Sequence, residues 1–148
     1  MYQEASVYTL RKLSTAEQQP YGLRVLTMRR WPRGIRRLDI DLWIPSAGPS
    51  IDLLAALHMG AIGWEMFLLR YCEEQEQQQS CRVVSYDEQG KPVSRDYPHR
   101  SLDHLQNLER QRGIVTLLCW ESGPLCHRHT LKRLAEALQA ANEGGDRV

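Results

Sequence analysis

Long apolar runs are missing from this sequence of 148 residues, although 42% of its side chains are hydrophobic. A transmembrane helix needs about 20 consecutive apolar residues, so the sequence predicts none. The opening segment, residues 1–12, lacks the basic start, the long apolar stretch and the small-residue cleavage site of a signal peptide. We therefore expect a soluble, cytoplasmic protein that does not associate with a membrane.

A strong excess of charge is also missing, because 19 basic residues stand against 18 acidic ones and leave a net charge of +1. That balance argues against a polyanionic partner. The charge is unevenly placed, since residues 1–40 are rich in arginine and residues 65–76 are rich in glutamate. A local basic cluster on a neutral protein favours a specific anion site, with a solvated basic face as the plain alternative.

Cysteine pairs of the Cys-x-x-Cys type are missing as well. The four cysteines are Cys72, Cys81, Cys119 and Cys126. In a cytoplasmic protein these thiols are expected to be reduced, and Cys72 and Cys81 could pair only under oxidising conditions. The sequence predicts neither a cofactor nor a bound metal.

The patterns that are present predict an α/β fold in one small domain, with a mostly parallel central sheet flanked by helices. Residues 114–121 (IVTLLCWE) are almost continuously apolar, as expected of a strand buried on both faces. Residues 82–97 predict a hairpin at an edge of the sheet. The expected strands lie near residues 7–11, 23–29 and 114–120, and the expected helices near residues 51–57, 63–75, 101–111 and 127–141.

We expect residues 1–148 to form a single domain, and several of its segments can be assigned from local sequence. Ser50 is the expected cap of helix 51–57. The helix near 63–75 carries apolar side chains at helical spacing, which favours a core position over a ligand platform. We interpret residues 72–100 as a hairpin-like insertion and residues 143–148 as a frayed tail.

An arginine-rich turn, residues 29–34 (RRWPRG), follows the second expected strand. Guanidinium groups bind phosphate or carboxylate in bidentate fashion and stay charged. Holding three of them together requires a counter-charge, which makes Arg29, Arg30 and Arg33 candidate ligand-binding residues. The alternative is that they pair with acidic groups of the chain, namely Asp39, Asp41 or Glu121.

A second turn, residues 119–128 (CWESGPLCHR), joins the strongest expected strand to the last helix. Ligands in open α/β sheets bind beyond the carboxyl ends of the strands, and free N–H groups at a helix start attract anions. Cys126 is therefore a candidate catalytic thiol of lowered pKa, and Glu121 a candidate base or partner for an arginine. His127 and Arg128 are candidate ligand-binding residues, whereas Cys119 is better explained as a buried packing residue.

Three sharper mechanisms can be weighed for the second turn. Cys-dependent phosphatase and sulfurtransferase loops place an arginine at a fixed short offset, where Cys119 and Cys126 here meet Leu125 and Lys132. That spacing counts against such a loop.

Zinc is a second mechanism, because cysteine and histidine are its preferred ligands. The candidate ligands are Cys119, Cys126, His127 and His129. His127 and His129 would point to opposite sides of a helix start, so at most three ligands could converge, and zinc is disfavoured.

A nucleophile with a general base is the third mechanism. Adjacent residues rarely form such a pair, so His127 is a poor base for Cys126. A base from elsewhere in the chain stays open, the candidates being His99, His104 and Glu121.

At both turns the sequence resembles the family known as "domain of unknown function 488". Residues 23–34 (LRVLTMRRWPRG), 38–50 (LDIDLWIPSAGPS) and 64–71 (WEMFLLRY) resemble one branch of that family. The Arg29–Arg33 run, together with Leu117-Leu118-Cys119-Trp120-Glu121 and Cys126-His127-Arg128, resembles the other. The similarity covers about residues 7–71 and 101–138.

Two departures from the family accompany the resemblance. An aspartate near the first arginine is replaced, since Thr27 and Met28 occupy its position, so Arg29 loses a natural partner. Residues 72–100 look like an insertion. The resemblance implies a compact α/β fold in which both turns meet at one edge of the sheet, and it implies no reaction.

The leading hypothesis is a pocket for a small anionic ligand, phosphate-like or nucleotide-like, built from the two turns and open to thiol-based catalysis. One alternative is a nucleic-acid-associated accessory module that uses Arg11, Arg24, Arg33, Arg36 and Arg37 and shows steep salt dependence. Another is a protein-interaction role for the loop 31–50 without catalysis. The position of the Arg29–Arg33 turn relative to residues 126–128 discriminates among them.

Overall fold

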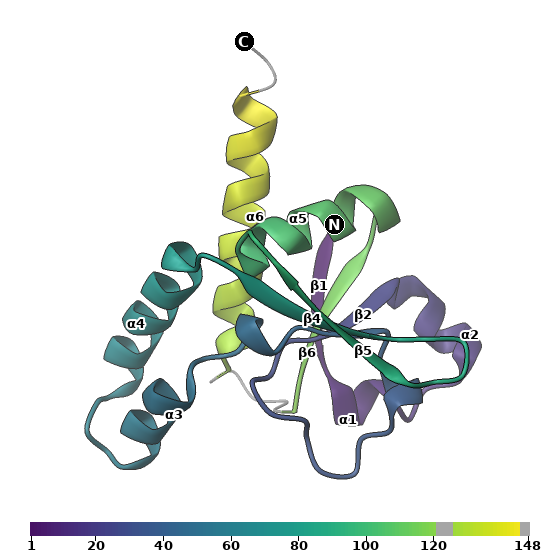
Figure 1. Cartoon of the computed structure of the whole chain (residues 1–148), viewed down its shortest axis with the longest axis horizontal. Helices are drawn as coiled ribbons and strands as arrows, with labels where there is room; N and C mark the ends of the chain where they lie inside the picture. Colours follow the sequence, from purple (N-terminus) through teal and green to yellow (C-terminus); the bar gives the residue numbers. More distant parts are fainter. Residues whose placement is uncertain (121–125, 146–148) are drawn as a thin grey trace.

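The computed structural model describes residues 1–120 and 126–145 (Figure 1). In chain order the elements are β1 (Tyr2–Ser6), α1 (Val7–Leu10), α2 (Thr15–Gln18), η1 (Gln19–Tyr21), β2 (Leu23–Leu26), η2 (Arg37–Asp39), β3 (Leu42–Trp43), η3 (Pro45–Ala47), α3 (Ile51–His58), α4 (Trp64–Gln77), β4 (Cys81–Tyr86), β5 (Pro92–Tyr97), α5 (Ser101–Arg112), β6 (Val115–Cys119) and α6 (His127–Gly145).

One six-stranded sheet organises the domain, in the order β1-β6-β2-β3-β4-β5. The strands β1, β6, β2 and β3 run parallel, and β4 and β5 form an antiparallel hairpin at one edge. The expected α/β class, the mostly parallel sheet and the edge hairpin are confirmed. Because β6 lies between β1 and β2, the carboxyl ends of β2 and β6 are neighbours in the sheet.

Apolar side chains pack on both faces of this sheet. Along β6, Val115 and Leu117 belong to the larger core, which includes residues of α3 to α6, and Leu118 belongs to a smaller core with residues of α1 and β2. All three side chains are fully buried. This two-sided burial explains why the strand is almost continuously apolar.

The expected first strand near residues 7–11 is wrong. Residues 2–6 form β1, and Val7–Leu10 form the short helix α1. The β-branched and aromatic content of 7–11 reflects burial in the smaller core, while the less apolar β1 is held by pairing with β6. Strand β2 is also shorter than expected, because it ends at Leu26 and leaves residues 27–30 beyond the sheet.

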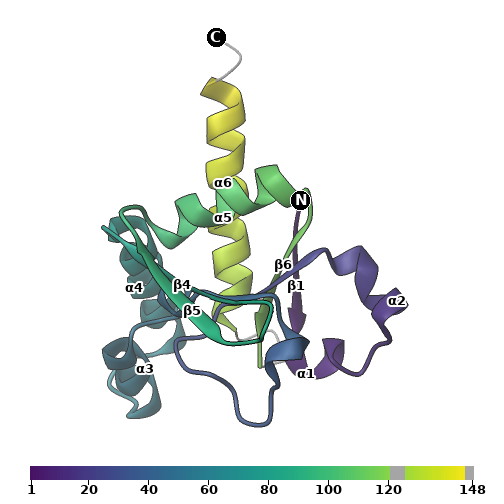
Figure 2. The same cartoon turned by 45° about the vertical axis from the view of Figure 1, so that its right-hand side comes forward.

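The helices agree closely with the pattern. Ser50 caps α3 by accepting a hydrogen bond from the N–H of Leu53 at 3.1 Å. In Figures 1 and 2 the α3–α4 pair lies to one side of the sheet, and α6 projects past the rest of the domain. Helix α6 continues to Gly145, and residues 146–148 of the expected tail lie outside the described part of the chain. No helix in that part is both long and apolar enough to cross a membrane.

Candidate functional site

The chain leaving β2 is held firmly beside the end of β6. The N–H and the hydroxyl of Thr27 both donate to the carbonyl of Leu118, at 2.9 and 3.0 Å. Gly48 packs against the next residues so closely that an added Cβ would lie 2.4 Å from the Arg29 nitrogen and 2.9 Å from the Met28 carbonyl carbon. Only glycine fits there, and the close approach fixes the start of the arginine turn.

Arg29 is half-buried at this turn and is held by backbone carbonyls. Its Nε donates to Pro49 O at 3.2 Å, and its Nη2 donates to Gly48 O at 3.0 Å. Burial lowers the pKa of Arg29, and the nearby Glu74 opposes that effect. Within residues 1–120 and 126–145, no carboxylate oxygen lies within 4.0 Å of its guanidinium. Arg29 is therefore a partly desolvated cation without an ion-pair partner among those residues.

The acidic groups proposed as alternative partners are already engaged. Asp39 pairs with Arg36 at 3.4 Å, and Asp41 pairs with Arg24 at 3.0 Å. Glu121 lies outside the described residues, so neither its role as a base nor its pairing with an arginine can be placed in the structure. The arginine turn is thus not neutralised by Asp39 or Asp41.

The thiols of Cys119 and Cys126 meet where β6 ends and α6 begins. The Cys126 sulfur donates to the Cys119 sulfur at 2.8 Å, and both side chains are buried. The pKa of Cys126 is raised, mainly by this hydrogen bond and to a smaller extent by burial. A hydrogen bond from the N–H of Arg128 lowers the pKa but does not outweigh them. The expected lowered pKa is therefore not supported, because the helix-end effect is outweighed.

His127 faces Cys126 although the two residues are adjacent in sequence. Its Nε2 lies 2.7 Å from the carbonyl of Thr27, which can only accept, so Nε2 carries the proton. Its Nδ1 therefore presents a lone pair, 3.9 Å from the Cys126 sulfur. Burial lowers the pKa of His127 to about 4, so the ring is neutral near pH 7. The expectation that His127 is a poor base for Cys126 stays a prediction, since its Nδ1 faces the sulfur while its pKa is low.

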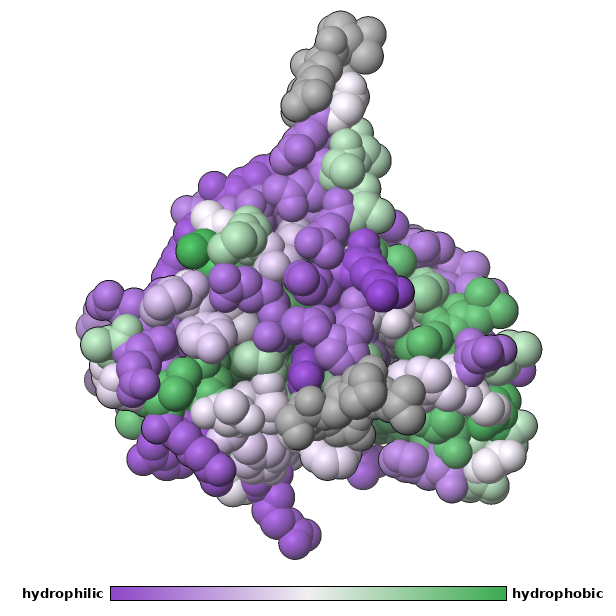
Figure 3. Space-filling view, turned by 180° about the vertical axis from the view of Figure 1, so that it is seen from behind, coloured by the Kyte–Doolittle hydropathy of each residue, from purple (hydrophilic) through white to green (hydrophobic). Residues whose placement is uncertain are grey.

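A cavity of about 190 Å³ joins the two turns, and we call it the Arg29–His127 cavity. Its polar lining comes from Arg29, Arg30, His58, Cys119, Cys126 and His127. Its apolar lining comes from Met28, Pro49, Leu54, Leu57, Trp64, Phe67 and Trp120. These residues come from α3, α4, the start of α6 and the neighbouring ends of β2 and β6. Helices α3 and α4 carry exposed apolar residues on their outer surface (Figure 3).

The cavity gathers some of the predicted site residues and leaves others outside. Arg29, Arg30, Cys126 and His127 line it, whereas Arg33 is exposed further along the turn and does not. The carbonyl of Arg33 accepts the hydroxyl hydrogen bond of Tyr8 at 2.6 Å. Arg128 is buried, with its side chain outside the cavity lining.

The other arginines of the basic N-terminal third contact groups of the domain itself. Besides the two ion pairs above, Arg11 donates to Gly34 O at 2.9 Å and Arg37 donates to Gly90 O. The tryptophans of the loop 31–50 are also engaged internally, since Trp31 Nε1 donates to Ile35 O and Trp43 Nε1 to Met28 O. These contacts favour structural roles over a nucleic-acid surface or a free interaction loop.

Two groups of side chains in the described residues have metal-ligand composition. In the first, ligand atoms of Cys119, Cys126 and His127 lie within 4.8 Å of one another, while His129 hydrogen-bonds to Glu4 instead. Two thiolates on one tetrahedral zinc lie about 3.8 Å apart, so the 2.8 Å between these sulfurs does not match a shared zinc ion. The second group, Cys81, His99 and His104, was missed in the sequence because it carries no recognised spacing.

The fold makes this chain a single-domain mixed α/β protein. A family model described as "DUF488-N3a: Active DUF488-N3 subclade" matches residues 7–140, and the chain belongs to this DUF488 family. The uncharacterized protein YeaO of Escherichia coli (strain K12) is 34% identical over 103 residues, which cover 66% of this chain and 83% of the relative. No solved structure matches the chain. The resemblance found at the two turns is confirmed.

Proposed function

We propose that this protein binds a small ligand with an anionic group and a flat apolar body, such as a phosphate ester or a nucleotide fragment, in the Arg29–His127 cavity. The observation that carries the proposal is Arg29. It is a half-buried cation that lines the cavity with Arg30 and has no ion-pair partner among the described residues. A bound anion would supply the missing counter-charge, and a guanidinium binds phosphate oxygens bidentately.

The apolar wall supports the second half of the ligand. Trp64 and Phe67 stack with ring centroids 5.1 Å apart and an interplanar angle of 20°, and both line the cavity. A volume of about 190 Å³ is below the several hundred cubic ångströms of pockets for drug-sized ligands. The cavity therefore takes a ligand no larger than a mononucleotide, and a dinucleotide is too large.

Thiol-based chemistry is the further part of the proposal, and Cys126 is its reactive residue. The raised pKa means that the resting Cys126 thiol is protonated and becomes a nucleophile only after it loses its proton. His127 Nδ1 is the unprotonated nitrogen beside that thiol, and with a pKa of about 4 it is too weak a base to remove the proton by itself. Arg29 and Arg30 hold the anionic group of the substrate during that step.

Binding is tested by titrating the protein with adenosine monophosphate and, separately, with adenosine, monitored by calorimetry or ligand-observed NMR. We expect the monophosphate to bind more tightly. Arg30→Gln should weaken that binding by about tenfold, since a charge-assisted hydrogen bond contributes about 1.5 kcal/mol. Arg30 is preferred over Arg29 because Arg29 also holds the Gly48–Pro49 backbone.

Arg33→Gln is the matched control, because Arg33 belongs to the same turn but does not line the cavity. It should leave the affinity unchanged. Equal affinities for adenosine and its monophosphate, or equal losses in the two arginine variants, would contradict an anion site in this cavity. Cys126→Ser should keep the binding and abolish any turnover, which separates the binding claim from the thiol claim.

A further inference from the structure

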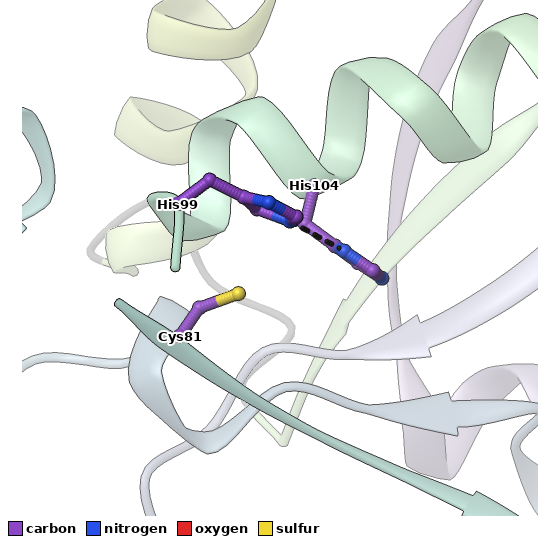
Figure 4. A group of neighbouring side chains, drawn as sticks. All are labelled: Cys81, His99 and His104. Carbon is purple, nitrogen blue, oxygen red and sulfur yellow. Dashed lines mark hydrogen bonds between the residues drawn. The ribbon is translucent and has the colours of Figure 1, made fainter. Parts of the chain in front are cut away.

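A second chemical cluster lies outside the cavity, where the β4–β5 hairpin meets α5 (Figure 4). Cys81 is the first residue of β4, His99 lies between β5 and α5, and His104 lies on the first turns of α5. The cysteine sulfur and one nitrogen of each histidine lie within 4.8 Å of one another. Figure 4 shows the Cys81 sulfur pointing toward the histidine pair.

The two histidines meet through their ring nitrogens, at a spacing that suits a metal. His99 Nε2 and His104 Nδ1 are 3.0 Å apart. Two nitrogens bound to one tetrahedral zinc, at about 2.0 to 2.1 Å each, are separated by about 3.3 Å. A cation in place of the shared hydrogen would require the two nitrogens to move apart by about 0.3 Å. The other cluster has no such match, because its sulfurs are too close.

The local structure fixes both histidines independently of any ligand. Arg100 and Asp103, the residues next to them in sequence, form a two-pronged ion pair with N–O distances of 2.9 Å. Tyr97 stacks on the ring of His99, with centroids 5.3 Å apart, and packs against the ring of His104 at 4.7 Å. Tyr97 is also the strand partner of Cys81 across the hairpin, so one side chain aligns all three groups.

Access and orientation also fit a metal site. His99 and His104 border a hollow of about 640 Å³ between the hairpin and α5, through which an ion and a water ligand can enter. Cys81 is buried, and its sulfur points toward the two histidine rings (Figure 4). Asp103 is engaged by Arg100, which leaves one sulfur and two nitrogens as the protein ligands.

We propose that Cys81, His99 and His104 bind one Zn²⁺ ion, with solvent as the fourth ligand, and thereby fasten the β4–β5 hairpin to α5. One thiolate with two imidazoles is a borderline-soft donor set that suits zinc over magnesium or calcium. The site shares no residue with the Arg29–His127 cavity, so this proposal does not depend on the proposed ligand-binding function.

The test is a titration of chelator-treated protein with Co²⁺, followed by displacement with Zn²⁺. We expect one equivalent of Co²⁺ to bind, with a tetrahedral visible spectrum and a near-ultraviolet charge-transfer band of one thiolate. Zn²⁺ should abolish both signals. Cys81→Ser should abolish the charge-transfer band, and His104→Gln should abolish tight binding. Circular dichroism shows whether each variant is folded.

Two matched variants complete the design. Cys72→Ser removes a thiol that belongs to neither cluster and should leave the titration unchanged. Cys126→Ser should also leave it unchanged. The spectrum of the wild-type protein shows by itself which cluster binds the metal, because the cluster of Cys119, Cys126 and His127 would give a charge-transfer band of two thiolates. Absence of stoichiometric binding, a two-thiolate band, or loss of the signal in Cys126→Ser would overturn the proposal.

Discussion

At the scale of single residues, the proton on His127 Nε2 determines which ring nitrogen faces Cys126 in the candidate site. The carbonyl of Thr27 accepts a hydrogen bond from His127 Nε2 and so fixes the tautomer of the ring. The other nitrogen then faces the Cys126 thiol. A residue that the family resemblance singles out only as a departure, Thr27, thus joins β2, β6 and α6 through its hydrogen bonds.

The partly buried, neutral state of His127 has a measurable consequence for stability. Its pKa is about 4 in the folded protein and about 6.5 in an unfolded chain. The unfolded state therefore binds the proton more readily, so the free energy of unfolding falls as the pH drops from about 6.5 to 4. The loss approaches about 3 kcal/mol and levels off below the folded pKa. Chemical denaturation at a series of pH values measures it.

His127→Gln should remove this component, because glutamine does not titrate and can still donate to Thr27 O. His58→Gln, at an exposed histidine, is the control and should keep the pH dependence. If His127→Gln retains the wild-type slope between pH 6.5 and pH 4, the histidine is not buried in its neutral form.

Individual site residues could be predicted from the sequence only where they lie in a short motif at the end of an expected strand or the start of an expected helix. Arg29, Arg30, Cys126 and His127 stand at strand ends and a helix start, and adjacent parallel strands bring their ends together. Arg33 belongs to the same motif but does not line the cavity, and the motif alone does not indicate which of its side chains face the cavity. The Cys81, His99 and His104 group is assembled by hairpin register and helix placement, which no spacing rule encodes.

At the scale of elements, the arginine turn depends on a contact between two irregular segments. Gly48 follows η3 and lies directly against the backbone of residues 27–29, where the neighbouring atoms are main-chain atoms that cannot rotate away. The same segment supplies the two carbonyls that hold the Arg29 guanidinium. The turn and the η3 segment therefore act as one structural unit.

Gly48→Ala should break that unit. The added methyl group overlaps the Arg29 nitrogen at 2.4 Å, so the two segments must separate. We expect a loss of about 1–3 kcal/mol in the free energy of unfolding, as for other overpacked sites. Gly144→Ala, where the added Cβ meets nothing within 4 Å, should cost nothing. Thermal and urea denaturation measure both, and a wild-type value for Gly48→Ala would contradict the packing.

The elements also show how far a sequence pattern reaches. Strand β6, the helices and the β4–β5 hairpin were predicted, because burial on two faces, helical spacing and turn residues each leave a regular signature. Strand β1 was not, since its sequence YQEAS has little strand character and its place comes from pairing with β6. The misplaced strand at 7–11 shows tertiary pairing overriding local propensity.

At the scale of the whole molecule, β6 is an inner strand with residues in both cores, while β5 is an edge strand with mostly exposed side chains. Native-state hydrogen exchange should show this difference. We expect the β6 amides to exchange only through global unfolding, and the β5 amides to exchange about two orders of magnitude faster through local opening. Equal protection of the two strands would contradict a sheet stabilised from β6 outward.

The central place of β6 also determines when the domain can be completed during synthesis. Strands β1 and β2 leave the ribosome long before β6, and among the described residues β6 is the only strand that pairs with β1. The nascent chain therefore carries an unpaired strand and half-covered apolar surfaces until almost all of the domain has emerged. We therefore expect the parallel part of the sheet to form only after β6 has emerged, late in the synthesis of this domain.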